Sequence, residues 1–228
     1  MKLSVIVPVF NEENSLQEII RKVQNIDIEK EIIIIDDFSN DGSREIIKTG
    51  TAGDNITRLY HDRNLGKGAA IRTGIKHVSG DIVIIQDADM EYDPGDYASL
   101  IAPIMRGDAD VVYGSRLSGG APQRVYMFWH MMGNKFLSFT TNLLYNTTLT
   151  DMETGYKVFK ADVIKAINLK SNRFEIEPEI TAKVFKRKYR VYELPISYYG
   201  RTYEEGKKIT WKDGFGALWT ILKYRFVD

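Results

Sequence analysis

Asp87 and Asp89 are the residues of this sequence best placed to hold a divalent cation. They stand one residue apart, they directly follow the apolar run 82–86, and Glu91 comes two residues later. Carboxylate oxygens suit Mg²⁺ or Mn²⁺, which keep several waters and share phosphate oxygens with a substrate. An Asp-x-Asp pair can equally be a turn or a helix cap. Its position directly after a buried strand makes the metal site a real alternative.

A second acidic pair and a basic turn could bind other parts of a nucleotide. Asp36 and Asp37 end another apolar run, where acidic side chains bond a base or ribose or cap the next helix. Gly66-Lys67-Gly68 opens a helical stretch whose N–H groups and dipole could hold phosphate. It is not a kinase-like P-loop, because Gly68 stands where Ser or Thr must follow the lysine.

Alternating apolar runs and helical repeats predict the elements that position these residues. Strands are expected at 3–9, 31–36, 56–60, 81–86, 110–113, 151–160 (a loop and strand) and 190–196. Helices are expected at about 16–26, 42–48, 67–78, 94–105, 125–145, 178–188 and 211–226. Strands separated by helices indicate a mostly parallel sheet, and ligands of such sheets bind beyond the carboxyl ends of the strands. Four of these ends carry polar groups, among them Glu12, Asp37, Asp89 and Arg116.

Composition narrows the possible functions. The 228 residues carry 31 Lys and Arg against 31 Asp and Glu, so no whole-molecule field for nucleic acid is expected. The absence of cysteine excludes disulfides, thiolate metal sites and a cysteine nucleophile, and it favours the cytosol. No run of 18 apolar residues occurs, so we expect no membrane-spanning helix. The three histidines lack the spacing of metal ligands, and no Ser–His pair suggests a hydrolase triad.

Six motifs, in order, cover nearly the whole chain. They are Val5-Ile6-Val7-Pro8-Val9-Phe10-Asn11-Glu12, Ile35-Asp36-Asp37-Phe38-Ser39, Asn64-Leu65-Gly66-Lys67-Gly68, Gln86-Asp87-Ala88-Asp89, Asp151-Met152-Glu153-Thr154-Gly155-Tyr156-Lys157 and Gly200-Arg201-Thr202-Tyr203-Glu204-Glu205-Gly206-Lys207-Lys208. The set resembles glycosyltransferase family 2 of the GT-A fold, and it looks like the branch that makes dolichyl- or undecaprenyl-phosphate sugars. The resemblance implies a Rossmann-like, mixed but mostly parallel α/β sheet flanked by helices, with a C-terminal amphipathic helix. We expect one domain over 1–228, with a nucleotide-binding half at about 1–116 and an acceptor-binding half at about 117–228.

The resemblance also implies roles for individual residues. The residues that would line the nucleotide site are Pro8, Phe10, Glu12, Asp37 and Lys67. The residues that would manage Mg²⁺ or Mn²⁺ are Asp87, Asp89 and Glu91, although relatives often have Gln at the last position. Arg201, on a polar loop at 198–208 that is expected to be mobile, would grip the diphosphate together with Lys207 or Lys208. Arg116 would lie near the acceptor phosphate, and Arg124 is a looser match.

These roles imply an inverting transferase that moves a hexose from a GDP- or UDP-sugar to a polyprenyl phosphate. One alternative acceptor is a sugar hydroxyl of a glycan or glycolipid, which would need a general base. Glu175, Glu177 and Glu179 are candidates for that base, or they are a solvated helix start. Another alternative is a non-catalytic sugar-nucleotide-binding subunit. A nucleotidyltransferase is disfavoured, because no Gly-rich loop follows the first strand.

The two aromatic helices have two interpretations. The helices expected at 125–145 and 211–226 carry Trp129, Trp211 and Trp219 beside basic residues such as Lys135 and Lys223. They can simply pack on the sheet, or they can lie in the headgroup layer of a membrane, where a polyprenyl acceptor is found. The second interpretation implies a cytoplasmic protein that is peripheral on the cytosolic face of a membrane and could have a membrane-anchored partner subunit.

Overall fold

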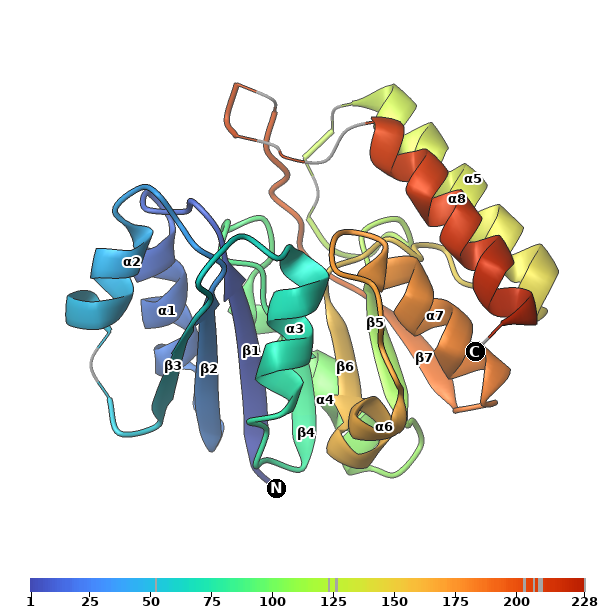
Figure 1. Ribbon diagram of the computed structural model, residues 1–228. Helices are drawn as coiled ribbons and strands as arrows, with labels where there is room; N and C mark the ends of the chain where they lie inside the picture. Colours follow the sequence, from blue (N-terminus) through green and yellow to red (C-terminus); the bar gives the residue numbers. More distant parts are fainter. Residues whose placement is uncertain are drawn as a thin grey trace.

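A mixed sheet forms the centre of the protein (Figure 1). The computed structural model describes residues 1–228 apart from 52, 123, 126, 203, 207, 209, 210 and 228, and at 211 and 212 it describes the backbone alone. Within these residues seven strands pair in the order β3-β2-β1-β4-β6-β5-β7. They are β1 (Leu3–Val9), β2 (Lys30–Asp36), β3 (Ile56–Tyr60), β4 (Ile82–Ile85), β5 (Val111–Ser115), β6 (Lys157–Lys160) and β7 (Val191–Pro195). β6 runs antiparallel to β4 and β5, whereas the other neighbouring pairs are parallel.

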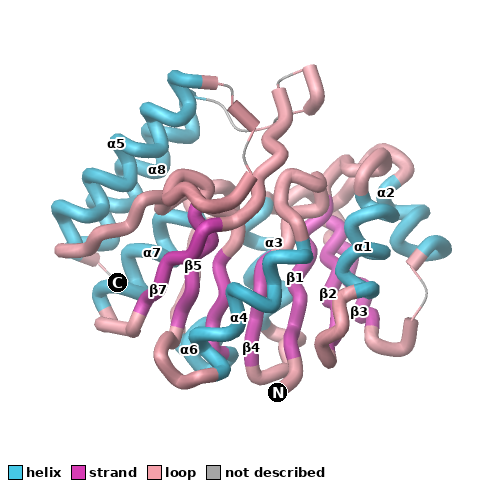
Figure 2. The backbone as a smooth tube through the Cα atoms, turned by 180° about the vertical axis from the view of Figure 1, so that it is seen from behind, coloured by secondary structure: helices cyan, strands magenta, loops and turns pink. Residues whose placement is uncertain are grey.

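Helices cover both faces of this sheet (Figures 1 and 2). The apolar residues of α1 (Leu16–Asn25) and α4 (Tyr97–Met105) pack on one face. Those of α3 (Lys67–Ile75), α6 (Ala161–Ala166) and α7 (Ile176–Lys186) pack on the other. Short helical turns occupy α2 (Ser43–Glu45), η1 (Ile46–Gly50) and η2 (Pro94–Asp96). The isoleucines of β2 are fully buried because they are covered from both sides, as their unbroken run predicts.

Two long helices lie side by side at one end of the molecule. α5 (Phe128–Tyr145) and α8 (Trp211–Phe226) pack against each other, and α8 also packs on α7 (Figure 1). Only part of each helix is buried. In α5 the residues Leu137, Ser138 and Thr141 are buried. The two helices are therefore anchored to the sheet layers along one side and exposed along another.

The expected α/β architecture with a mostly parallel sheet is confirmed, and the differences lie at element boundaries. The helix expected from residue 125 begins at Phe128, because Met127 adopts a left-handed conformation (φ 55°, ψ 58°) that a right-handed helix cannot include. The helix expected from Pro178 begins at Ile176, since proline is tolerated in a first helical turn. α6 was not expected, because its six residues are too few for a periodic pattern.

Candidate functional site

The predicted site residues gather at one edge of the sheet. The carboxyl ends of β1, β2, β4 and β5 lie there, and so does the start of the antiparallel β6. A cavity of about 1190 Å³ opens at this edge. The predicted residues that line it are Pro8, Phe10, Glu12, Asp37, Lys67, Asp87, Asp89, Glu91, Arg116, Arg124, Arg201 and Lys208. Lys207, predicted beside them, lies outside the described residues.

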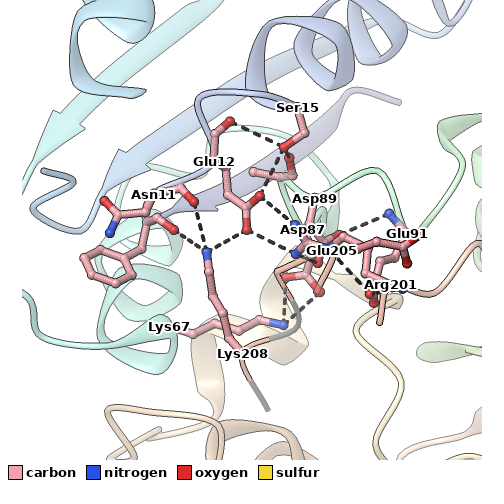
Figure 3. Close-up of polar contacts among 12 residues, drawn as sticks. Asn11, Glu12, Ser15, Lys67, Asp87, Asp89, Glu91, Arg201, Glu205 and Lys208 are labelled. Atoms are coloured by element: carbon pink, nitrogen blue, oxygen red, sulfur yellow. Dashed lines mark hydrogen bonds and ion pairs between the residues drawn. The ribbon is translucent and has the colours of Figure 1, made fainter. Parts of the chain in front are cut away.

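The two carboxylates after β4 each face a cation from a distant part of the chain (Figure 3). Lys67 Nζ, at the start of α3, lies 2.7 Å from Asp87 Oδ1. Arg201 Nη2 lies 2.9 Å from Asp89 Oδ2. Arg201 Nη1 and Lys208 Nζ lie 3.1 Å and 2.6 Å from the carboxylate oxygens of Glu12. The acidic strand ends and the basic loop thus form one charged network.

The electrostatics of this network suit a bound cation and a bound anion. Burial and, after it, the neighbouring carboxylates Asp87 and Glu91 together raise the pKa of Asp89 to about 7, against the opposing effect of Arg201. Burial disfavours the charged form of Lys67, but Asp87 and Glu177 outweigh it and raise the pKa of the ammonium. Carboxylates that crowd each other are stabilised by a divalent cation, and the freed lysine and arginine are donors for phosphate oxygens.

A metal ion would be held here by two carboxylates of the chain. In the described part of the chain no three acidic or histidine side chains converge as metal ligands. Asp87 and Asp89 nevertheless have the hard oxygen donors that Mg²⁺ and Mn²⁺ prefer, and such ions complete their shell with water and phosphate. The donor set therefore fits a cation that is shared with a diphosphate, and such a cation would neutralise negative charge on the leaving group.

Glu91 holds the loop of Arg201 in this structure. Its Oε1 accepts a hydrogen bond of 2.7 Å from the backbone N–H of Arg201, and its Oε2 accepts one of 2.8 Å from the hydroxyl of Tyr198. Tyr199 N–H donates to the carbonyl of Glu91 over 2.9 Å. Both carboxylate oxygens thus point toward segment 198–201. A metal ligand role for Glu91 stays a prediction, and its observed contacts position Arg201.

Asp37 organises the turn before α3. Its oxygens accept hydrogen bonds from Leu65 N and Gly66 N at 2.8 Å and 2.7 Å, and His61 Nδ1 lies 2.7 Å away. The turn needs glycine, since Gly66 has φ of 97° and a Cβ on Gly68 would approach the carbonyl oxygen of Ser171 to 2.5 Å. Asp37 also lines the cavity, so a contact to a base or ribose stays a prediction beside this structural role.

Arg116 directly follows β5 and also lines the cavity. Its Nε and Nη2 bond the two oxygens of Asp151 at 2.6 Å and 2.7 Å, and its guanidinium stacks on the Tyr198 ring at 5.2 Å. Among the described residues Nη1 has no acceptor, so this edge of the fork can bind a ligand oxygen. Asp151 also raises the pKa of Arg116 against the effect of burial. The residue is a fixed cation on the cavity wall.

Two of the three glutamates at the start of α7, Glu177 and Glu179, are not part of a solvated helix start. Glu179 is fully buried, bonds Lys183 Nζ at 2.6 Å and accepts hydrogen bonds from Lys170 N and Ser171 N. Glu177 is also buried and pairs with Lys157 Nζ at 2.6 Å and Lys67 Nζ at 3.1 Å. That expectation is corrected for both residues, because tertiary contacts supply cations that helical periodicity does not reveal. Of the three glutamates, the cavity is lined by Glu177.

Sequence reasoning assigned no role to Glu153, which also lines the cavity. It belongs to the Asp151–Lys157 motif, and this motif could have drawn attention to it. The sequence does not show the antiparallel direction of β6, however, which brings Glu153 to the site. Burial raises the pKa of Glu153 to about 7. Lys157 and Tyr198 were likewise not singled out, and they hold Glu177 and Glu91 in place.

The cavity continues onto the apolar helices. Its wall includes Phe128, Trp129 and Leu137 of α5 and Ala217 of α8. Large apolar side chains of the two helices are exposed, including Trp129 at 81%, Phe139 at 65%, Leu143 at 73% and Trp219 at 67%. None of the described helices is both long and apolar enough to cross a membrane. A charged pocket and an exposed apolar face are thus continuous.

Known proteins resemble this chain in sequence and in structure. A sequence profile described as Glycosyl transferase family 2 matches residues 4–167. A UDP-N-acetylglucosamine–dolichyl-phosphate N-acetylglucosaminyltransferase of Methanococcus voltae is 28% identical over 236 residues, covering 96% of this chain and 94% of that protein.

Solved structures agree in fold at lower identity. Glucosyl-3-phosphoglycerate synthase of Mycobacterium tuberculosis, in complex with Mn²⁺, UDP and glucosyl-3-phosphoglycerate, has a TM-score of 0.74 at 17% identity over 100% of this chain and 81% of that one. The same enzyme with Mg²⁺ and UDP has a TM-score of 0.71 at 17% identity, over 100% of this chain and 80% of that one. The fold of the present chain is therefore that of the GT-A glycosyltransferases.

Proposed function

The chain belongs to glycosyl transferase family 2 and is a glycosyltransferase, and we propose that it moves a hexose from a GDP- or UDP-sugar to a polyprenyl phosphate with inversion. The observation that carries the proposal is a cavity that joins the carboxylates Asp87 and Asp89, the cation Arg116 and the apolar wall of α5. The charged part of this cavity suits a sugar nucleotide and a phosphate, and the apolar wall suits a hydrocarbon chain.

The donor half of the proposal rests on the charged network. Lys67, Arg201 and Lys208 are cations that a diphosphate could take over from their carboxylate partners. The relative from Methanococcus voltae is named for a UDP-sugar donor, and the Mycobacterium tuberculosis structures contain UDP with Mn²⁺ or Mg²⁺. UDP-sugars are therefore the first donors to test.

The acceptor half rests on Arg116 and on the apolar wall. A phosphate monoester is largely dianionic at neutral pH because its second pKa is about 6, so it needs a cation rather than a base. Its oxygen would attack the anomeric carbon while the bond to the diphosphate breaks, and no proton has to move. Arg116 would orient that oxygen, and Arg201 would stabilise the charge that develops on the departing diphosphate.

A donor and acceptor screen tests the proposal directly. Purified protein with Mn²⁺ would receive radiolabelled UDP-N-acetylglucosamine, UDP-glucose or GDP-mannose, each with undecaprenyl or dolichyl phosphate or with a glycolipid hydroxyl acceptor. We expect label in a lipid-soluble phosphodiester with one donor. Label transferred only to the hydroxyl acceptor would refute the polyprenyl phosphate, and release of free sugar alone would refute both acceptors.

Nucleotide binding should depend on a metal held through Asp89. Calorimetry with UDP and GDP should show an affinity at least tenfold weaker in Asp89→Ala or after chelation, since Asp87 and Asp89 would hold a divalent cation that neutralises diphosphate charge. Glu18→Gln, on the exposed face of α1, serves as a control that changes a carboxylate without touching the site. Unchanged affinity in a folded Asp89→Ala protein would contradict the metal site.

Membrane association should depend on the exposed face of α5 and α8. Each of Trp129→Glu and Trp219→Glu places a charge on this face and should reduce flotation with vesicles that contain anionic lipid, because interfacial helices bind through apolar burial. Met105→Glu changes another exposed apolar residue on α4 and should leave flotation unchanged. If neither tryptophan variant differs from the wild type, the face does not contact lipid.

The location on the cytosolic side stays a prediction, and the comparisons give no support for a membrane-anchored partner subunit.

A further inference from the structure

We propose that Glu153 recognises the transferred sugar, by accepting hydrogen bonds from its hydroxyl or amide groups. The inference rests on the proposed function in so far as the cavity holds a sugar nucleotide. It goes beyond that function because it names a residue that selects the sugar.

The chain brings Glu153 close to the donor carboxylates. The segment before β6 crosses the carboxyl edge of the sheet, and Gly155 packs directly against the site, since a Cβ there would approach Asp87 Oδ2 to 2.5 Å. Glu153 precedes this contact by two residues and lines the cavity with Arg116 and Glu177. It therefore lines the same cavity as the predicted diphosphate site and the predicted acceptor cation, and the sugar has to lie in this cavity during transfer.

The other carboxylates on this wall have cationic partners. Asp151 bonds Arg116, and Glu177 bonds Lys157 and Lys67. The buried Oε1 atoms of Glu153 and Glu177 both receive no hydrogen bond from any described residue. Lys67 Nζ lies 3.1 Å from Glu177 Oε1, however, whereas Glu153 forms no ion pair with the described residues. A buried acceptor left without a donor destabilises the protein, and more so when it is charged. A ligand that brings a donor would remove this destabilisation.

The chemistry of the unpaired carboxylate selects among the groups that reach the cavity. Phosphate oxygens accept hydrogen bonds and carry negative charge, so they are repelled by an ionised Glu153. Sugar hydroxyls and an acetamido N–H donate hydrogen bonds, and bonds to a charged acceptor are about twice as strong as neutral ones. Because a dianionic phosphate acceptor needs no base, Glu153 is available for this recognition.

The charges around Glu153 give the interaction a pH dependence. Burial is the largest influence and raises its pKa to about 7, Lys157 and Arg116 lower it, and Glu177 and Asp151 raise it. A carboxyl whose pKa is raised by folding binds its proton more tightly in the folded protein. The contribution of this carboxyl to folding stability therefore falls as the pH rises from its pKa in the unfolded chain toward its folded pKa of about 7. Sugar binding should follow the opposite trend, because hydroxyl donors favour the ionised form.

The experiment compares each sugar nucleotide with its own nucleoside diphosphate. Calorimetry with Mn²⁺ would use UDP-N-acetylglucosamine against UDP, UDP-glucose against UDP and GDP-mannose against GDP, at pH 6 and pH 8. The affinity for the sugar nucleotide divided by the affinity for its nucleoside diphosphate isolates the contribution of the sugar to binding. Any effect of Asp89 on nucleotide binding cancels in this ratio, because it changes the affinities for both members of a pair. For the preferred donor we expect the ratio to be higher at pH 8, to fall about tenfold in Glu153→Ala, and to lose its pH dependence in Glu153→Gln.

Stability measurements separate this role from a structural one. Glu153→Gln removes a carboxylate that is costly to ionise, so its melting temperature should exceed that of the wild type at pH 8 and the gain should shrink at pH 5. A residue that merely supports the fold would lower the melting temperature. Glu18→Gln, an exposed carboxylate on α1, should change neither the affinity ratio nor its pH dependence.

Three outcomes overturn the inference; the first two leave the proposed function untouched, whereas the third would also replace the phosphate acceptor by a hydroxyl. The first is an unchanged affinity ratio in Glu153→Ala. The second is an equal loss of affinity for nucleotide and sugar nucleotide. The third is a kcat loss of about 10² to 10⁴ in Glu153→Gln at unchanged donor affinity, which would identify a general base for a hydroxyl acceptor. By contrast, failure of the wild-type protein to bind any of these nucleotides would refute the proposed function itself.

Discussion

Arg201→Ala is expected to lower kcat by about 10²- to 10³-fold, the usual effect of removing a donor that stabilises transition-state charge. In the structure Arg201 bridges Asp89 and Glu12 from the loop that Glu91 holds, so its guanidinium already lies at the predicted diphosphate site. The KM for the sugar nucleotide should change much less, because charge on the leaving group is largest in the transition state.

Initial rates at saturating donor, with the verified acceptor, measure this effect. Arg201→Lys keeps a charge but loses the planar fork, so its kcat should fall between those of the wild type and the alanine variant. Circular dichroism and melting temperature control for folding. A kcat of Arg201→Ala within threefold of the wild type would contradict the leaving-group role.

Arg116→Lys is expected to reduce kcat/KM for polyprenyl phosphate by roughly 10- to 10²-fold while the affinity for the donor nucleotide stays near normal. Lysine is the diagnostic change because it keeps a cation beside Asp151, which is fully buried. Arg116→Ala would leave that carboxylate unpaired, and a broken buried pair typically costs about 3–5 kcal/mol. The lysine loses the planar fork, which means the bidentate contact with Asp151 and the Nη1 edge that would grip a phosphate oxygen, but it keeps the charge.

Arg124→Lys is the matched control for this substitution. Arg124 lies on the rim of the same cavity, is more exposed and pairs with Glu205. Its conversion to lysine should alter kcat/KM less than threefold. If Arg116→Lys is equally mild and the protein transfers sugar to a hydroxyl, the phosphate acceptor is wrong and a carboxylate base must be sought.

Much of the fold could be predicted because local patterns and burial agree. The isoleucines of β2 occupy a strand that is covered on both faces, and the spacing of Leu16, Ile19 and Val23 matches the buried side of α1. The positions of Asp37 and Asp89 after strands were enough to place them at one edge, since parallel strands share a carboxyl edge. The helix boundaries at Phe128 and Ile176 could not be predicted, because they depend on a left-handed residue and on a proline that a first turn accepts.

The amino-acid sequence alone determined the family resemblance, the alternation of strands and helices, and the set of charged residues at the strand ends. It could do so because these properties depend on residue type and short spacing. Only the tertiary structure decided which charges pair. Glu177 meets Lys157, which lies twenty residues earlier, and Lys67, which lies much earlier still, so both are far beyond helical reach. Glu91 meets the loop of Arg201.

The direction of β6 was decided by the tertiary structure as well. The motif around Glu153 was visible in the sequence, but an apolar run has the same pattern whether its strand is parallel or antiparallel. Because β6 pairs antiparallel with β4 and β5, its first residues rather than its last lie at the carboxyl edge of the sheet. That reversal brings Asp151 to Arg116 and Glu153 into the cavity, and side-chain periodicity carries no information about it.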